Sequence, residues 1–168
     1  MKSLKINFQH FDADQHFENI DIVCTEKVWQ PGRVLGCSLA EIRITDGANT
    51  ANIRIKFEWI FDREEIREED FCFVESTGML FFRSINQFGI IDVVNKCLKE
   101  HKEAHWCPFI SKYNTFVLVE DDLSAKSFTL QGKLIDEVPL DPPYEMQEFE
   151  DRLEYTCDIH GHQVLKTR

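Results

Sequence analysis

Apolar and polar residues alternate most regularly between Ala51 and Phe61. The apolar positions of this stretch are Ile53, Ile55, Phe57, Trp59 and Phe61, and the positions between them are Asn52, Arg54, Lys56, Glu58 and Ile60. A period of two predicts a β-strand that buries one face. Another β-rich run, from Arg33 to Ile44, precedes it, and Asp46-Gly47 lies between the two. Because Asp-Gly is typical of a tight turn, the two runs are predicted to form an antiparallel hairpin.

Shorter β-rich runs occur along the rest of the chain. Two of them flank Thr77-Gly78 and predict a second hairpin, and a last hairpin is predicted to turn at His160-Gly161. The runs that we interpret as strands are Phe17–Trp29, Phe71–Val74, Met79–Arg83, Thr115–Glu120, Ser127–Ile135, Leu153–Ile159 and His162–Leu165.

The spacing of the apolar residues changes after Ser84, from the period of a strand to that of a helix. Gln87 follows three residues later, which is the pattern of a capping box at the start of a helix. Residues at spacings of three or four then line one predicted helical face, namely Ile90, Val94, Cys97 and His101. This spacing predicts one long helix, from about Ile85 to Ala104.

The order of these elements favours an α+β fold. Strands come in runs and do not alternate with helices, which argues against a parallel α/β sheet. Proline suits the first turn of a helix, so Pro143 allows a short second helix that reaches Arg152. We therefore predict an antiparallel sheet of six to nine strands with one long helix, with or without the short one. The length of 168 residues predicts a single domain over residues 1–168.

Negative charge is concentrated towards the C-terminus. The chain carries a net charge of −11, and residues 120–158 hold 12 acids against three bases (Lys126, Lys133 and Arg152), which leaves −9 in this stretch. Such a surface repels phosphates, which argues against direct nucleic-acid binding. It attracts a basic protein instead. The alternative is that the acids only keep the protein soluble.

The candidate partner-binding residues are acids of this stretch beside one aromatic residue. The acids are expected to speed the encounter with a basic protein, and the aromatic ring is expected to hold the complex. These residues are Glu120, Asp121, Asp122, Glu148, Glu150, Asp151 and Tyr144.

Two groups of histidine and cysteine are candidate metal ligands. They are His101, His105 and Cys107, and, about fifty residues further on, Cys157, His160 and His162. Zinc accepts such mixtures of sulfur and nitrogen ligands. The chain has neither a C-x2-C pair nor the H-E-x-x-H motif that make zinc patterns specific. We therefore expect two unrelated groups without a metal, and a shared site is the alternative.

The sequence contains few motifs for other kinds of functional site. The chain has no G-x-G-x-x-G motif and no Walker loop, which argues against a nucleotide site, and we expect no cofactor. Most of the six cysteines lie in apolar runs, so we expect reduced thiols and a cytoplasmic protein. No apolar run approaches the roughly 20 residues of a membrane span. No residue stands out as catalytic.

These observations support two hypotheses of different classes. The leading one is a small acidic module that binds another protein, such as an inhibitor or immunity protein that masks a basic surface. The alternative is a metal-dependent hydrolase that uses the two histidine and cysteine groups.

Overall fold

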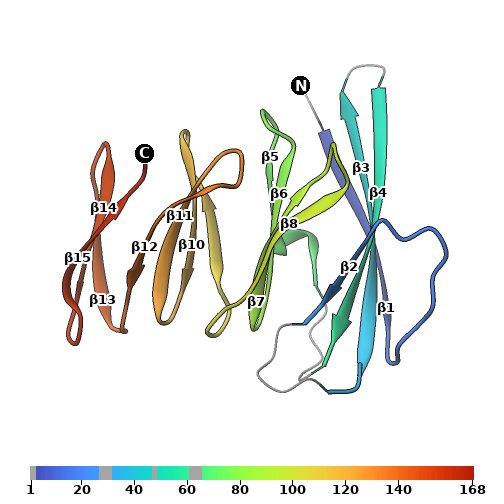
Figure 1. The fold of residues 1–168 in the computed structure, drawn as a ribbon, viewed down its shortest axis with the longest axis horizontal. Coiled ribbons are helices and arrows are strands. Elements are labelled where there is room, and N and C mark those ends of the chain that lie inside the picture. Colours follow the sequence, from blue (N-terminus) through green and yellow to red (C-terminus); the bar gives the residue numbers. More distant parts are fainter. Residues whose placement is uncertain (1–2, 27–31, 47–48, 61–65) are drawn as a thin grey trace.

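The computed structural model describes residues 3–26, 32–46, 49–60 and 66–168. Within these ranges the chain forms fifteen β-strands and one 3-10 helix of three residues, η1 (Glu68–Asp70). The strands make four sheets, A to D, which follow one another in chain order along the long axis of the molecule (Figure 1). The predicted α+β fold is wrong, because the described residues contain no α-helix.

Sheet A has the strand order β1-β3-β4-β2. Its strands are β1 (Ser3–Phe11), β2 (Ile22–Thr25), β3 (Gly36–Asp46) and β4 (Asn49–Trp59). The predicted hairpin is confirmed, because β3 and β4 pair antiparallel up to Asp46 and Asn49. Gly47 and Ala48 between them lie outside the described residues. The weak strand predicted over Phe17–Trp29 is reduced to β2, which runs parallel to β4, and Trp29 is not described.

Sheet B is a meander of four strands in chain order. They are β5 (Phe71–Val74), β6 (Met79–Ser84), β7 (Gln87–Asp92) and β8 (Cys97–Glu103). The second predicted hairpin is confirmed by the pairing of β5 with β6. Gly78 in its turn has a φ of 77°, a conformation that glycine adopts without strain.

The long helix predicted over Ile85–Ala104 is instead β7, a turn and β8. The residues at helical spacing belong to different elements, since Ile90 lies in β7 and Val94 lies in the turn with 68% of its surface exposed. Strand β7 is buried on both faces, with Ile90 facing sheet C and Ile91 facing sheet A. A strand buried on both faces has no polar alternation, so its sequence resembles that of a buried helix.

Sheets C and D are also meanders. Sheet C contains β9 (Phe109–Lys112), β10 (Phe116–Asp121), β11 (Ser124–Thr129) and β12 (Leu134–Pro139), and sheet D contains β13 (Tyr144–Glu148), β14 (Arg152–Cys157) and β15 (Gly161–Lys166). The single strand predicted over Ser127–Ile135 is divided by a turn at Gly132, whose φ is 78°. The short second helix predicted from Pro143 to Arg152 is wrong, because β13 and the start of β14 occupy these residues. The last hairpin, β14 and β15, is confirmed.

The core lies in three layers between neighbouring sheets. Successive residues of one strand reach opposite layers: in β6, Phe82 packs towards sheet A and Phe81 towards sheet C. In β10, Val117 packs towards sheet B and Leu118 towards sheet D. The two inner sheets are therefore covered on both faces. Sheet D turns one face to solvent, whereas the outer face of sheet A is partly covered by the segment between β1 and β2.

The structure shows no disulfide among the described residues, and Cys24, Cys37 and Cys157 are buried. No helix in the described ranges has the length and apolar character that a membrane crossing requires.

Candidate binding surface

The turns of sheets B, C and D meet along one edge of the molecule. We call residues 85–86, 104–108, 121–123, 140–143 and 158–160 the turn edge. Backbone hydrogen bonds connect its parts: Cys107 N donates to Ile85 O (2.7 Å), Asp122 N to His105 O (3.1 Å), and Leu140 N to Leu123 O (2.9 Å). The exposed apolar side chains on this edge are Trp106, Leu123 and Ile159.

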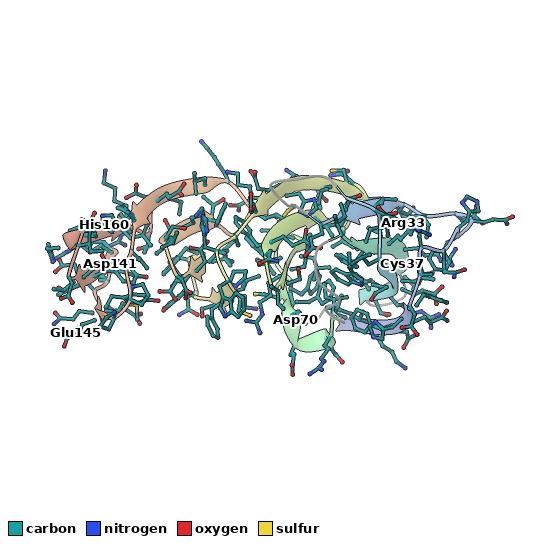
Figure 2. All side chains as sticks on the ribbon, turned by 90° about the horizontal axis from the view of Figure 1, so that it is seen from below. Arg33, Cys37, Asp70, Asp141, Glu145 and His160 are labelled. Atoms are coloured by element: carbon teal, nitrogen blue, oxygen red, sulfur yellow. The ribbon has the colours of Figure 1, made fainter. Side chains whose placement is uncertain are left out.

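Two buried carboxylates organise the turn edge. The carboxylate of Asp121 accepts hydrogen bonds from the backbone N–H groups of Leu123 (3.0 Å), Ser124 (2.8 Å) and His105 (3.2 Å). That of Asp141 accepts from Ile159 (2.8 Å) and His160 (3.1 Å), and Figure 2 shows Asp141 beside His160 at the sheet D end. Each aspartate is 7% exposed. Asp121, a candidate partner-binding residue, is therefore mainly a structural group.

We expect Asp121→Ala to lower the free energy of unfolding by about 2 kcal/mol, because it leaves the buried N–H of Ser124 and two part-buried N–H groups without their acceptor. The neighbouring Asp122 is exposed, so Asp122→Ala should change stability by less than about 0.5 kcal/mol. Urea unfolding of both variants measures the difference. Equal stabilities would contradict the structural role of Asp121.

Glu120 contacts Tyr155, with Tyr144 beside it, and Tyr113 lies further away in the connection between β9 and β10. The hydroxyl of Tyr155 donates a hydrogen bond of 2.8 Å to Oε1 of Glu120. The ring of Tyr144 meets that of Tyr155 edge-on at 5.7 Å between centroids, and Tyr113 stacks on Phe116 at 4.2 Å. We call Glu120 and the three tyrosines the tyrosine–glutamate cluster. It lies between sheets C and D.

Burial is the main influence on the pKa values of the groups in this cluster. Burial raises the pKa of Glu120, and the hydrogen bond from Tyr155 opposes that rise. Burial is also the main cause of the raised pKa values of the three tyrosines, and the negative charge of Glu120 adds to each of them. Within the described residues, Glu120 forms no ion pair with a lysine, arginine or histidine. Its carboxylate therefore lacks a cationic partner.

The remaining candidate acids lie at the other end of sheet D. Glu148 ends β13 opposite Leu153, whereas Tyr144 begins β13 opposite Cys157. Glu150 and Asp151 lie in the turn after β13, where Glu150 is 3.6 Å from Arg168. The seven candidate partner-binding residues thus fall into two groups. One is near the turn edge and the other is at the β13–β14 turn.

The structure does not bring the two candidate metal groups together. His101 belongs to β8 of sheet B, and its Nε2 lies 2.6 Å from Oε1 of Gln87. Cys157 ends β14 in sheet D, and sheet C lies between these two sheets (Figure 1). His105 and Cys107 follow β8 on the turn edge, and His160 and His162 lie in and after the last hairpin turn. The described residues contain no group of three or more histidine, cysteine, aspartate or glutamate side chains suited to hold a metal.

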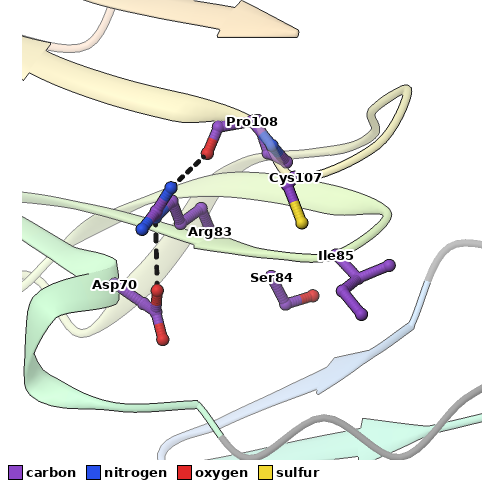
Figure 3. Close-up of a pocket in the computed structure, with 6 residues that line it drawn as sticks. All are labelled: Asp70, Arg83, Ser84, Ile85, Cys107 and Pro108. Carbon is purple, nitrogen blue, oxygen red and sulfur yellow. Dashed lines mark hydrogen bonds and ion pairs between the residues drawn. The ribbon is translucent and has the colours of Figure 1, made fainter. Parts of the chain in front are cut away.

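A small cleft adjoins the β6–β7 turn (Figure 3). Its volume is about 60 Å³, room for a few water molecules. Arg83 in this cleft is already engaged by Asp70 (3.2 Å) and by the carbonyl of Pro108 (2.9 Å), and its guanidinium lies 5.3 Å from the ring centroid of Phe109. The Oγ of Ser84, on the cleft wall, is buried and has no hydrogen-bond partner among the residues that the structure describes. Bound water suits this cleft better than a substrate does.

Sequence reasoning missed Tyr113 and Tyr155. Tyr155 lies on the buried face of β14 with Leu153 and Cys157, so its alternation predicted a core residue. Tyr113 lies in the β9–β10 connection, next to a strand that was not predicted. The available signal was the scarcity of tyrosine, since all three lie between residues 113 and 155, largely within the acidic stretch.

Comparison with known proteins gives no family. No family model matches the chain, and no curated protein matches it. Similar solved structures include KlHsv2 with loop 6CD replaced by a Gly-Ser linker (12% identity, 82% of this chain and 47% of that chain, TM-score 0.39). Another is Hsv2p from Kluyveromyces lactis (14% identity, 83% of this chain and 45% of that chain, TM-score 0.38). A third is BamB from Moraxella catarrhalis (11% identity, 83% of this chain and 59% of that chain, TM-score 0.26). The chain spans about half the length of the Hsv2 structures, and TM-scores this low establish neither its fold nor its function.

Proposed function

We propose that the chain is a binding module for a basic protein, as an inhibitor or immunity protein would be, and that sheets C and D carry its binding surface. The observation that carries this proposal is the imbalance of charge in these two sheets. Residues 109–166, which form these sheets, hold 12 acids against five bases (Lys112, Lys126, Lys133, Arg152 and Lys166), and two of the bases are already paired within them. Lys126 lies 3.0 Å from Glu137, and Arg152 lies 2.6 Å from Glu154.

The surplus acids face solvent. Asp122, Glu145, Glu148 and Asp158 are exposed, and no described cation forms an ion pair with them. Exposed charges of one sign produce a field that reaches about one Debye length, roughly 8 Å at physiological ionic strength. Such a field increases the rate of encounter with a basic protein and weakens as salt rises. No observation favours the metal-dependent hydrolase.

The test compares two variants of equal net charge. The first neutralises exposed acids of sheets C and D by Asp122→Asn, Glu148→Gln, Glu150→Gln and Asp151→Asn. The second neutralises exposed acids outside them by Glu18→Gln, Glu68→Gln, Glu75→Gln and Glu103→Gln. The probe is a short fluorescent peptide of alternating lysine and glycine, and binding is followed by fluorescence anisotropy at low and physiological salt.

We expect the first variant to bind the probe about fivefold more weakly than the native protein at low salt. The second should weaken binding by less than about twofold, because its acids lie farther from the proposed surface. If both variants lose affinity equally, only the net charge acts on the probe. The acids of sheets C and D would then serve solubility alone.

A further inference from the structure

The tyrosine–glutamate cluster has the composition of a receptor for a cation. Aromatic rings attract a cation through their electron-rich faces, and a nearby carboxylate adds a direct ionic contact. Tyr155 occupies one oxygen of Glu120 and fixes the carboxylate in place. The other oxygen, Oε2, accepts no hydrogen bond from the described residues.

The surroundings of this carboxylate are partly open, since Glu120 itself is only partly buried. Tyr113 and Tyr144 are half-buried, so their rings border the cluster without closing it. Met146 pairs with Tyr155 across β13 and β14 and is 42% exposed. An exposed apolar side chain near a half-buried carboxylate suits the aliphatic stem of a long cationic side chain.

We propose that the tyrosine–glutamate cluster binds one cationic side chain, arginine or lysine, of a basic protein partner. This inference rests on the proposed function and names the point of closest recognition. The exposed acids of sheets C and D increase the rate of encounter. The cluster then accepts a single cation beside the partly exposed ring of Tyr144, with its charge on the carboxylate of Glu120. The raised pKa of Glu120 agrees with a carboxylate that lacks a cation in the free protein.

The test uses single amino acid analogues in place of the partner. The probes are Nα-acetyl-arginine methylamide, Nα-acetyl-lysine methylamide and the uncharged isostere Nα-acetyl-citrulline methylamide. Binding is followed by NMR on protein with isotope-labelled tyrosine. Since the chain has only the three tyrosines of the cluster, every ring signal reports on this site. The cationic probe that binds more tightly identifies the side chain.

We expect at least one cationic probe to shift the tyrosine ring signals in a saturable manner, and citrulline to leave them unchanged. Glu120→Gln, whose amide oxygen can still accept the Tyr155 hydrogen bond, should weaken binding about tenfold or more. The matched control is Glu145→Gln, because Glu145 is an exposed acid on the outer face of the same sheet. That variant should bind within about twofold of the native protein.

Equal shifts from citrulline, or no saturable shift from either cation, would overturn the inference even if Glu120→Gln fails to fold. The outcome is separable from that of the proposed function, because none of the four acids neutralised there belongs to the cluster. If the lysine–glycine peptide still prefers the native protein while the analogues leave the tyrosines unshifted, only the cluster inference fails. If the analogues bind the cluster but both four-acid variants bind the peptide equally, the proposed function fails.

Discussion

Phe57→Ala is expected to lower the free energy of unfolding by about 3–5 kcal/mol. Phe57 is fully buried in β4, and its ring meets those of Phe82 (5.1 Å), Phe71 (5.9 Å) and Trp59 (6.4 Å). Phe71 and Phe82 belong to sheet B, so this ring joins the first two sheets. Its removal costs the transfer of the ring out of the core and leaves a cavity that rigid aromatic neighbours cannot fill.

The matched control is the same substitution at an exposed position. Phe109 is 64% exposed and touches Arg83, so Phe109→Ala should lower stability by less than about 1 kcal/mol. Both variants are compared by urea unfolding, with circular dichroism as the signal. Similar losses from the two substitutions would mean that sheets A and B do not pack through Phe57.

Gly89→Ala is expected to lower the free energy of unfolding by about 3 kcal/mol. A Cβ at position 89 would lie 2.3 Å from Cε1 of Phe82 and 2.9 Å from the carbonyl oxygen of Glu100. Neither group can move freely. Phe82 is fully buried against Phe57, and the oxygen belongs to the backbone of β8. The close approach of Phe82 to β7 therefore requires glycine at this position.

A double-mutant cycle tests the stated cause of this loss. In a Phe82→Leu background the aromatic ring is absent, so Gly89→Ala should cost at least about 1 kcal/mol less than in the native protein. Chemical denaturation of the four proteins gives the coupling free energy. A coupling of zero would show that the methyl group does not clash with Phe82.

The sequence predicted strands well where one face meets solvent. Strand β4 alternates because its outer positions, such as Asn52, are exposed while Ile53 and Ile55 are buried. It predicted strands poorly where both faces are covered. In β7 the burial on both sides removed the alternation, and the residue spacing then resembled that of a helix. The stacking of whole sheets, which causes this burial, has no local signal in the sequence.

Lys56 shows the same limit at the scale of one side chain. Its alternation in β4 places it on the polar face, and yet it is 8% exposed. The reason is an ion pair with Glu58 (2.7 Å) and another with Asp14, which lies in the segment between β1 and β2. A loop from a distant part of the sequence covers this face, which the period of the strand cannot indicate.

The candidate site was predictable in its charge and not in its geometry. The surplus of acids is visible in the sequence, and so is Tyr144. The approach of Tyr144 and Tyr155 to Glu120 depends on the packing of sheet C against sheet D. Asp121 is the opposite case. Its charge predicted a role in partner binding, but its carboxylate accepts hydrogen bonds from the backbone of a turn.

The central claim is that a basic partner binds sheets C and D and not simply the acidic protein as a whole. NMR chemical-shift mapping of the native protein with the lysine–glycine peptide tests this claim most directly. We expect the backbone amide shifts to concentrate between residues 109 and 166, in the strands and turns of sheets C and D. Shifts spread evenly over the four sheets, or concentrated in sheets A and B, would contradict the account.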